Sequence, residues 1–420
     1  MSKFTKRGAS LPSLKEPAAS RPIVDIAPPA QVIVPLVAGD GTVCRPAAGL
    51  YETVTRGEPV GLPELDGGLG VPASVSGVLA DLREMSHPLL GDIPCAVIDC
   101  MAWGDEVPGP PRDTGALTAE EIRTAARFAA VVDELDGRLL ADKLDELREG
   151  GPCLLVADAT EQEPYASSAW AVLNESPVEV NDGLSLAARA AGTGASFIAV
   201  RAPRRRRRPL EDKLDGRPLY AARGRYPAAL APLSNSLTVR RVGVQACLSL
   251  YRAAAYAHPQ CDVVVTVTGD AVANPQNVRV PVGTLVEDLL HFCGLSKEPE
   301  YILLGDAMTG LAVSQTDVPV IPGIACVVAL TARPQPPTRT CIGCGRCVRA
   351  CHAGLLPFEI MRRLDNMQYE RLQKLLPEEC DGCGACSYVC PAGLEVTAKV
   401  LEAKDARGNI FLKWGDGDDV

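Results

Sequence analysis

The sequence predicts a multidomain α/β protein with a barrel-sandwich of the biotinyl/lipoyl type, a Rossmann-like parallel α/β domain, a β-grasp unit and a cysteine-motif domain, in that order. Three observations predict this architecture. Short strands separated by Gly and Pro come first, strands and helices alternate in the middle of the chain, and two cysteine runs lie near the C-terminus.

Composition limits the classes of protein that fit. With 420 residues the chain exceeds the about 250–300 residues of a single core, so several domains are expected. The net charge of −10 argues against nucleic acid as a partner. No signal peptide or membrane-spanning apolar stretch is evident, and the 16 cysteines indicate a reducing compartment. We therefore expect a cytoplasmic protein that docks peripherally, at most, on a membrane complex.

The N-terminal part divides into an arm and a small β domain. Residues 1–30 are rich in Pro, Ser and Ala and are predicted to form a mobile arm. Residues 31–103 contain two similar hairpin-like units, 51–61 and 71–79, the pattern of a barrel-sandwich. The tip at 73–76 has no Lys to carry a prosthetic group, so we expect a structural or docking module. The glycines at 67–70 precede Pro and a strand and are predicted to form a turn.

The middle of the chain alternates between helix and strand. After a linker at 104–118, the α/β domain is predicted over 119–258, beginning at a capping box of Thr118 and Glu121 and a helix to about Val132. Apolar strands at 153–157 and 197–200 with a helix between them favour a doubly wound parallel sheet. The arginine run 204–208 is predicted to be a solvated loop.

A third module is predicted over residues 259–332. Strands at 262–268, 277–282, 301–304 and 325–330 enclose one short amphipathic helix that ends before Gly294. Strands around a single helix indicate a β-grasp unit.

The last module, 333–402, carries two runs of the form C-x2-C-x2-C-x3-C, and a tail follows at 403–420. This spacing places three thiolates on one [4Fe–4S] cluster and sends the fourth to a neighbouring cluster. A zinc site needs only four thiolates and would not require the repeated pattern. The predicted ligand sets are Cys341, Cys344, Cys347 and Cys390 for one cluster, and Cys380, Cys383, Cys386 and Cys351 for the other.

The order of modules resembles the RnfC family, named for a component of the Rnf electron-transport complex, with soluble relatives of the PrdC and PduS types. The resemblance covers about residues 31–400 and is carried by the segments 73–77, 161–165, 267–270, 341–347 and 387–391. It implies that the β-grasp unit is SLBB-like. It also implies that Glu161, Glu163 and Tyr165 match the family's acidic turn beside flavin and nicotinamide.

One departure concerns that nucleotide site. The family's α/β domain opens with a glycine-rich loop whose N–H groups cradle phosphate. Here the corresponding stretch 127–138 has one glycine and the carboxylates Asp133, Glu134 and Asp136. Carboxylates repel phosphate, so bound FMN or NADH is disfavoured.

Other reactive residues receive simpler interpretations. His352 replaces the Pro that usually follows the fourth cysteine, and we expect it beside the cluster rather than on it. Cys44, Cys95 and Cys100 lie in apolar runs and are predicted core residues, with a redox or metal-binding trio as the alternative.

Three functions remain open at this point. The preferred one is an iron–sulfur electron-transfer protein that relays single electrons from a reduced donor, NADH-linked or ferredoxin-like, to a partner reductase or Rnf-like complex subunits. The first alternative is an NADH-oxidising FMN subunit of the Rnf type, and the second is a structural docking adaptor. The sequence predicts an electron-transfer subunit rather than a complete enzyme.

Overall fold

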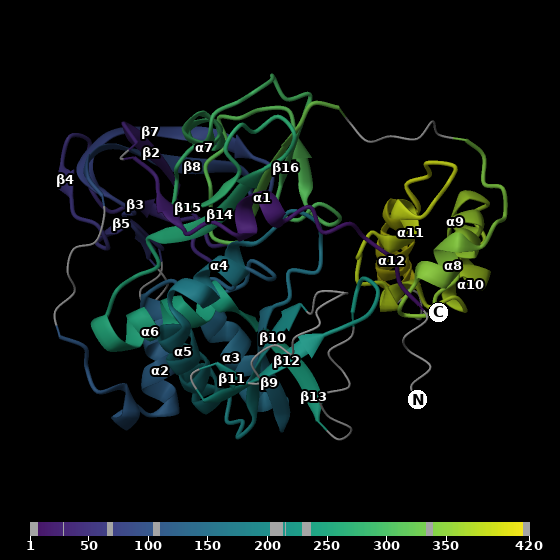
Figure 1. Cartoon of the computed structure of the whole chain (residues 1–420), viewed down its shortest axis with the longest axis horizontal. Coiled ribbons are helices and arrows are strands. Elements are labelled where there is room, and N and C mark those ends of the chain that lie inside the picture. Colours follow the sequence, from purple (N-terminus) through teal and green to yellow (C-terminus); the bar gives the residue numbers. More distant parts are fainter. Residues whose placement is uncertain are drawn as a thin grey trace, which may run out of the picture.

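A computed structural model describes residues 7–27, 29–64, 70–103, 110–201, 213–214, 216–228, 237–332 and 339–414. It contains the predicted modules, with the helical C-terminal unit set to one side of the rest (Figure 1). The predicted glycine turn at 67–70 (apart from Gly70) and the arginine run at 204–208 lie outside the described residues. No helix in the described part of the chain is both long and apolar enough to cross a membrane.

The N-terminal β domain has two small sheets. One joins β2 (Gln31–Pro35), β8 (Gly91–Ala102), β7 (Ser76–His87) and β4 (Thr53–Val54). The other joins β3 (Arg45–Pro46), β5 (Pro59–Leu62) and β6 (Val71–Pro72). Apolar side chains of both sheets, including Val34, Val60 and Leu79, form one buried core, as expected of a barrel-sandwich.

The α/β domain has the sheet order β11 (Lys213–Leu214), β12 (Arg217–Ala222), β10 (Ser196–Arg201), β9 (Cys153–Ala159), β13 (Thr238–Gly243). All pairs except β11 with β12 are parallel, and every residue of the central β9 is buried. A strand buried on both faces has a continuous apolar sequence, which is why the sequence alone predicts it.

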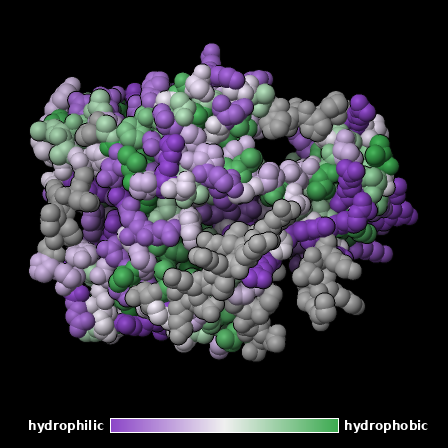
Figure 2. Space-filling view, in the orientation of Figure 1, coloured by the Kyte–Doolittle hydropathy of each residue, from purple (hydrophilic) through white to green (hydrophobic). Residues whose placement is uncertain are grey.

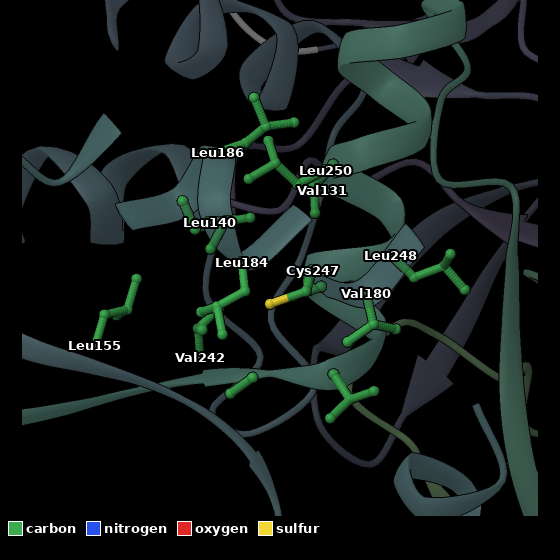
Figure 3. Close-up of a cluster of buried hydrophobic side chains, with 14 of the residues drawn as sticks. Val131, Leu140, Leu155, Val180, Leu184, Leu186, Val242, Cys247, Leu248 and Leu250 are labelled. Atoms are coloured by element: carbon green, nitrogen blue, oxygen red, sulfur yellow. The ribbon is translucent and has the colours of Figure 1, made fainter. Parts of the chain in front are cut away.

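Helices of this domain gather on one face of its sheet. They are α2 (Ala119–Phe128), α3 (Leu140–Glu149), α4 (Ser168–Glu175), α5 (Pro177–Ala190) and α6 (Val244–Tyr256). Side chains of α5 and α6 meet in the main core, where Leu184 and Val180 lie near Cys247 (Figure 3). The opposite face carries a smaller cluster around Leu154 and Val156, and no described helix covers it, in contrast to the doubly wound expectation.

The first helix of the domain confirms its predicted start but not its end. Both halves of the capping box form, between Thr118 and Glu121. The helix ends at Phe128 rather than near Val132, because Val132 forms a β-bridge with Leu139 and its N–H donates to Gln260. Tertiary hydrogen bonds thus outweigh the local helical pattern.

The β-grasp unit is one mixed sheet with a helix across it. Its strands in order are β1 (Val24–Asp25), β15 (Gln276–Pro281), β14 (Asp262–Thr268), β18 (Cys326–Leu330), β16 (Tyr301–Leu304) and β17 (Leu311–Val313). Helix α7 (Val286–Cys293) ends at Gly294, whose φ of 72° is the left-handed conformation that glycine adopts without strain. This confirms the predicted stop.

The N-terminal segment 7–27 differs from the expected mobile arm. It contains helix α1 (Glu16–Ala19) and strand β1, and β1 pairs in parallel with β15. Ala9 forms a bridge with Tyr226, and Ala18 is fully buried. Figure 1 shows the segment running between the β-grasp unit and the C-terminal helices. Its Pro- and Ser-rich composition therefore suits an extended strap, since Pro favours extended backbone.

Five helices make the C-terminal unit: α8 (Arg346–Ala350), α9 (Pro357–Asp365), α10 (Tyr369–Gln373), α11 (Ala385–Tyr388) and α12 (Val396–Trp414). Ile360 and Leu364 of α9 pack with Val400 of α12 in its core. Helix α12 continues past Glu402, so part of the expected tail is helical.

Packing of α5 on α6 gives a stability prediction. A Cβ placed on Gly183 would lie 1.9 Å from the carbonyl oxygen of Cys247, and backbone cannot yield cheaply. Gly183→Ala should lower the free energy of unfolding of the α/β domain by about 1–3 kcal/mol despite alanine's better helix propensity. Denaturant unfolding followed by circular dichroism measures it. The control is Gly194→Ala, where nothing lies within 4 Å of the added carbon. Equal stability of the two variants would contradict the prediction.

Candidate iron–sulfur site

Two loops of the C-terminal unit carry the cysteine motifs. Gly343, Gly345, Gly382 and Gly384 all have φ between 67° and 75°. Residues with side chains rarely adopt this left-handed conformation, so the glycines allow each loop to curl before α8 or α11 begins. The loop N–H of Gly382 donates to the Cys380 sulfur at 3.4 Å, as expected for a loop that directs N–H groups at sulfur.

Each loop borders a cavity lined by four cysteines. The cavity at the first loop is lined by Cys341, Cys344, Cys347 and Cys390. The cavity at the second loop is lined by Cys351, Cys380, Cys383 and Cys386. Each cavity thus combines three cysteines of one motif with the last cysteine of the other.

Burial sets the chemistry of these thiols. Loss of hydration raises the pKa of Cys383 to about 12 and that of Cys386 to about 11. It also raises the pKa of Cys347 and Cys380. Metal binding requires thiolates, so protons must leave these sulfurs when a metal enters. Four soft sulfur donors per cavity fit an iron–sulfur cluster.

His352 lies beside the second cavity and takes no place among its four sulfurs. Its Nε2 is 2.7 Å from a carboxylate oxygen of Asp381, a residue of the other motif. Another Asp381 oxygen accepts the N–H of Cys383 at 3.2 Å. His352 therefore links the two motifs, consistent with a supporting position.

A buried carboxylate joins the C-terminal unit to two other domains. Glu163 accepts hydrogen bonds from the N–H of Met308 at 2.5 Å and the hydroxyl of Thr309 at 2.9 Å, both in the β-grasp unit. The Tyr226 hydroxyl lies 2.7 Å from Glu163 and 2.7 Å from the carbonyl oxygen of Cys383. Burial and the Glu163 charge raise the pKa of Tyr226, so its proton stays available to both acceptors.

The other two residues of the acidic turn also have internal partners. Glu161 accepts the N–H groups of Ala169 and Trp170 at the start of α4, at 2.8 and 3.3 Å. The N–H of Tyr165 donates to Ser13 in the N-terminal segment. Lys15 of that segment donates to Ala166. The turn that the sequence associates with a flavin is therefore covered by the chain's own N-terminal segment.

The expected phosphate cradle is filled by carboxylates. Glu134 accepts the N–H groups of Gln245 and Ala246 at 2.7 and 3.0 Å, in the first turn of α6. Asp133 accepts the N–H of Gly243 at 2.9 Å and pairs with Lys143 at 2.6 Å. These are the N–H groups and the cation that a phosphate would use, so the residues do not fit FMN or a dinucleotide here.

Sequence reasoning missed Lys15, Tyr226 and Met308. None belongs to a motif, and each acts through a partner more than 140 residues away. Only the spatial meeting of the domains reveals them.

The remaining cysteines suit the core interpretation. Cys44 and Cys95 are buried, and Cys100 is half-buried. Burial raises the pKa of all three, that of Cys95 to about 11. Protonated thiols in apolar surroundings are poor nucleophiles and poor metal ligands.

Family models match three parts of the chain. Residues 3–102 match the RnfC barrel sandwich hybrid domain, 264–311 the SLBB domain and 340–394 the 4Fe-4S dicluster domain. The matches agree with the barrel-sandwich, β-grasp and cluster modules.

Relatives match over most of the chain. The RnfC-type component of the ion-translocating oxidoreductase complex of Rhodobacter capsulatus is 27% identical over 389 residues, covering 86% of this chain and 75% of that protein. The corresponding component of the proton-translocating ferredoxin:NAD(+) oxidoreductase complex of Clostridium ljungdahlii is 25% identical over 384 residues, covering 85% and 83%. A crystal structure of an NAD+-reducing [NiFe]-hydrogenase in the H2-reduced state has a TM-score of 0.46 and 14% identity over 73% of this chain and 68% of that one, a likeness too low to bear on the site.

The Tyr226 contact gives a prediction about domain docking. Tyr226→Phe removes the donor shared by Glu163 and Cys383, which costs about 1–3 kcal/mol when buried acceptors lose a partner. Amide hydrogen exchange in residues 380–390 should speed up, while the cores of the α/β and barrel-sandwich domains keep their protection. Tyr388→Phe, at a half-exposed tyrosine of the same unit, is the control and should leave exchange unchanged. Equal exchange in wild type and Tyr226→Phe would contradict this role.

Proposed function

This chain belongs to the RnfC family, and from that premise we propose that it relays single electrons between a reduced carrier and a partner redox protein. It is an iron–sulfur electron-transfer protein with two [4Fe–4S] clusters in its C-terminal domain. The relatives are components of multi-protein complexes by name, which supports protein partners for this chain as well.

One observation carries the proposal about the ligands. Each of two neighbouring cavities is lined by four cysteines, with Cys351 and Cys390 exchanged between the motifs. We assign Cys341, Cys344, Cys347 and Cys390 to one cluster, and Cys380, Cys383, Cys386 and Cys351 to the other. When bound, such clusters supply one-electron transfer at potentials set by burial and hydrogen bonds to sulfur. The chain's own contribution is to hold the thiolates, exclude water and direct N–H groups at them.

The flavoenzyme alternative has less support. Carboxylates of Asp133 and Glu134 occupy the backbone N–H groups at the start of α6, and Lys15 covers the 161–165 turn. We propose that the described chain relays electrons without a flavin of its own, so that its electron donor is another protein. Whether NADH feeds the relay is then decided by that partner.

The first test is stoichiometric. Purified without oxygen, the chain should contain about eight iron and eight acid-labile sulfide atoms, from two cubes of four. Cys344→Ser should remove or convert one cluster and leave the other, giving about half the iron and one surviving electron-paramagnetic signal. The control Cys100→Ser changes a cysteine outside both cavities and should keep the full content. About four iron atoms in the wild type, or zinc in their place, would contradict the assignment.

The second test concerns flavin. The purified chain should carry no stoichiometric FMN and should not be reduced by NADH alone, because its N–H donors at α6 are already bonded to Glu134. Dithionite should still reduce it. Absorbance spectra after each reductant, with a flavin assay of the denatured protein, measure both expectations. Recovery of one FMN per chain would favour the flavoenzyme alternative instead.

A further inference from the structure

The two cysteine cavities face different surroundings. In the second cavity Cys386 is buried, and the Cys383 carbonyl is bonded to Tyr226 of the α/β domain. The neighbouring Ala385 packs in a core with Ala9 and Tyr226. In the first cavity, Cys341 and Cys344 are exposed to solvent. One cavity is therefore turned toward the body of the protein and the other toward solvent.

Positive charge collects around the exposed cavity. From residue 339 to residue 358 the chain has three arginines and no Asp or Glu. The N–H of Arg339 donates to Ala392, which lines the cavity, and Arg346 lines it directly. The Arg349 guanidinium lies 3.5 Å from the carbonyl oxygen of Cys344. None of the three arginines is buried, and none pairs with a carboxylate in the parts of the chain that the structure describes.

An apolar residue lies among these arginines. Ile342, between the two exposed cysteines, is 69% exposed. An exposed apolar centre within a charged surround is the usual anatomy of a protein–protein contact. Figure 2 shows that the C-terminal unit stands clear of the rest of the molecule over much of the drawn face, which leaves room for a partner.

The charge of the whole chain gives this surface its selectivity. The protein carries a net charge of −10, so an acidic partner is repelled by most of it. Three arginines without carboxylate partners among the described residues attract such a partner at one place, and opposite potentials steer association. An anionic membrane is a poorer fit, because lipid-binding clusters usually contain about four to eight basic residues.

Resting on the relay function proposed above, we infer that Arg339, Ile342, Arg346 and Arg349, the arginine rim, form the docking surface of a small acidic one-electron carrier protein. Docking there brings the carrier to the solvent-facing cavity, while the second cavity faces the α/β domain. The exchange moves one electron between the carrier and this chain, and no bond forms or breaks. The arginine rim thus separates an outer exchange point from an inner one.

The test measures binding of the anaerobically purified full chain to an acidic [2Fe–2S] ferredoxin as the probe. The double variant Arg346→Gln/Arg349→Gln should weaken binding about tenfold at low salt and flatten its salt dependence. The control Arg371→Gln/Lys374→Gln removes the same charge from the same unit at positions outside the rim and should bind as the wild type does. Arg339→Gln, at a residue outside both cysteine motifs, should weaken binding by a smaller factor if the double variant loses iron.

Three outcomes would overturn the inference: equal binding by rim and control variants, binding that does not weaken with salt, or rim-dependent binding to phosphatidylglycerol vesicles without binding to the ferredoxin. Failure of the relay itself has a different signature. Reduced methyl viologen, a cation that needs no arginine rim, should reduce the wild type and both double variants alike. Its failure with the wild type would contradict the relay function, whatever the binding results.

Discussion

Three domains meet at the buried carboxylate of Glu163, and the position of the cysteine cavities depends on that meeting. The carboxylate holds the 308–309 backbone of the β-grasp unit and, through Tyr226, the carbonyl of Cys383. A buried carboxylate must have its oxygens bonded, because an unpaired one is costly. The requirement to satisfy one charge therefore fixes the C-terminal unit against the rest of the protein.

The same requirement explains the N-terminal segment. Lys15 and Ser13 lie over the 161–166 turn, and Ala9 pairs with Tyr226 beside the cysteine unit. A segment that contacts three domains in succession adds little area to any one of them, but it limits how they move relative to one another. The strap and the Glu163 contacts together make the inner cavity part of a continuous structure.

The α/β domain keeps its fold while its phosphate-binding chemistry has been replaced. A helix start offers unpaired N–H groups that an anion can satisfy. Here Glu134 and Asp133 supply that anion from within the chain. Burial raises the pKa of Glu134 to about 8, with repulsion from Asp133 as the next cause, which is the cost of placing two carboxyl groups together. The domain thus gains a stable α6 and gives up the site that a phosphate would need.

The sequence by itself determined the features that depend on local spacing. Cysteine intervals specify the two clusters, apolar runs such as β9 specify buried strands, and Gly294 specifies the end of α7. The missing glycine loop was also visible, as three carboxylates where phosphate binding needs none. Only the tertiary structure decided that Glu134 caps α6, that Tyr226 reaches Cys383 and that residues 7–27 form a strap. Spacing along the chain encodes contacts made within a few residues, whereas these contacts join residues 100 or more apart, and their partners appear only when the domains pack.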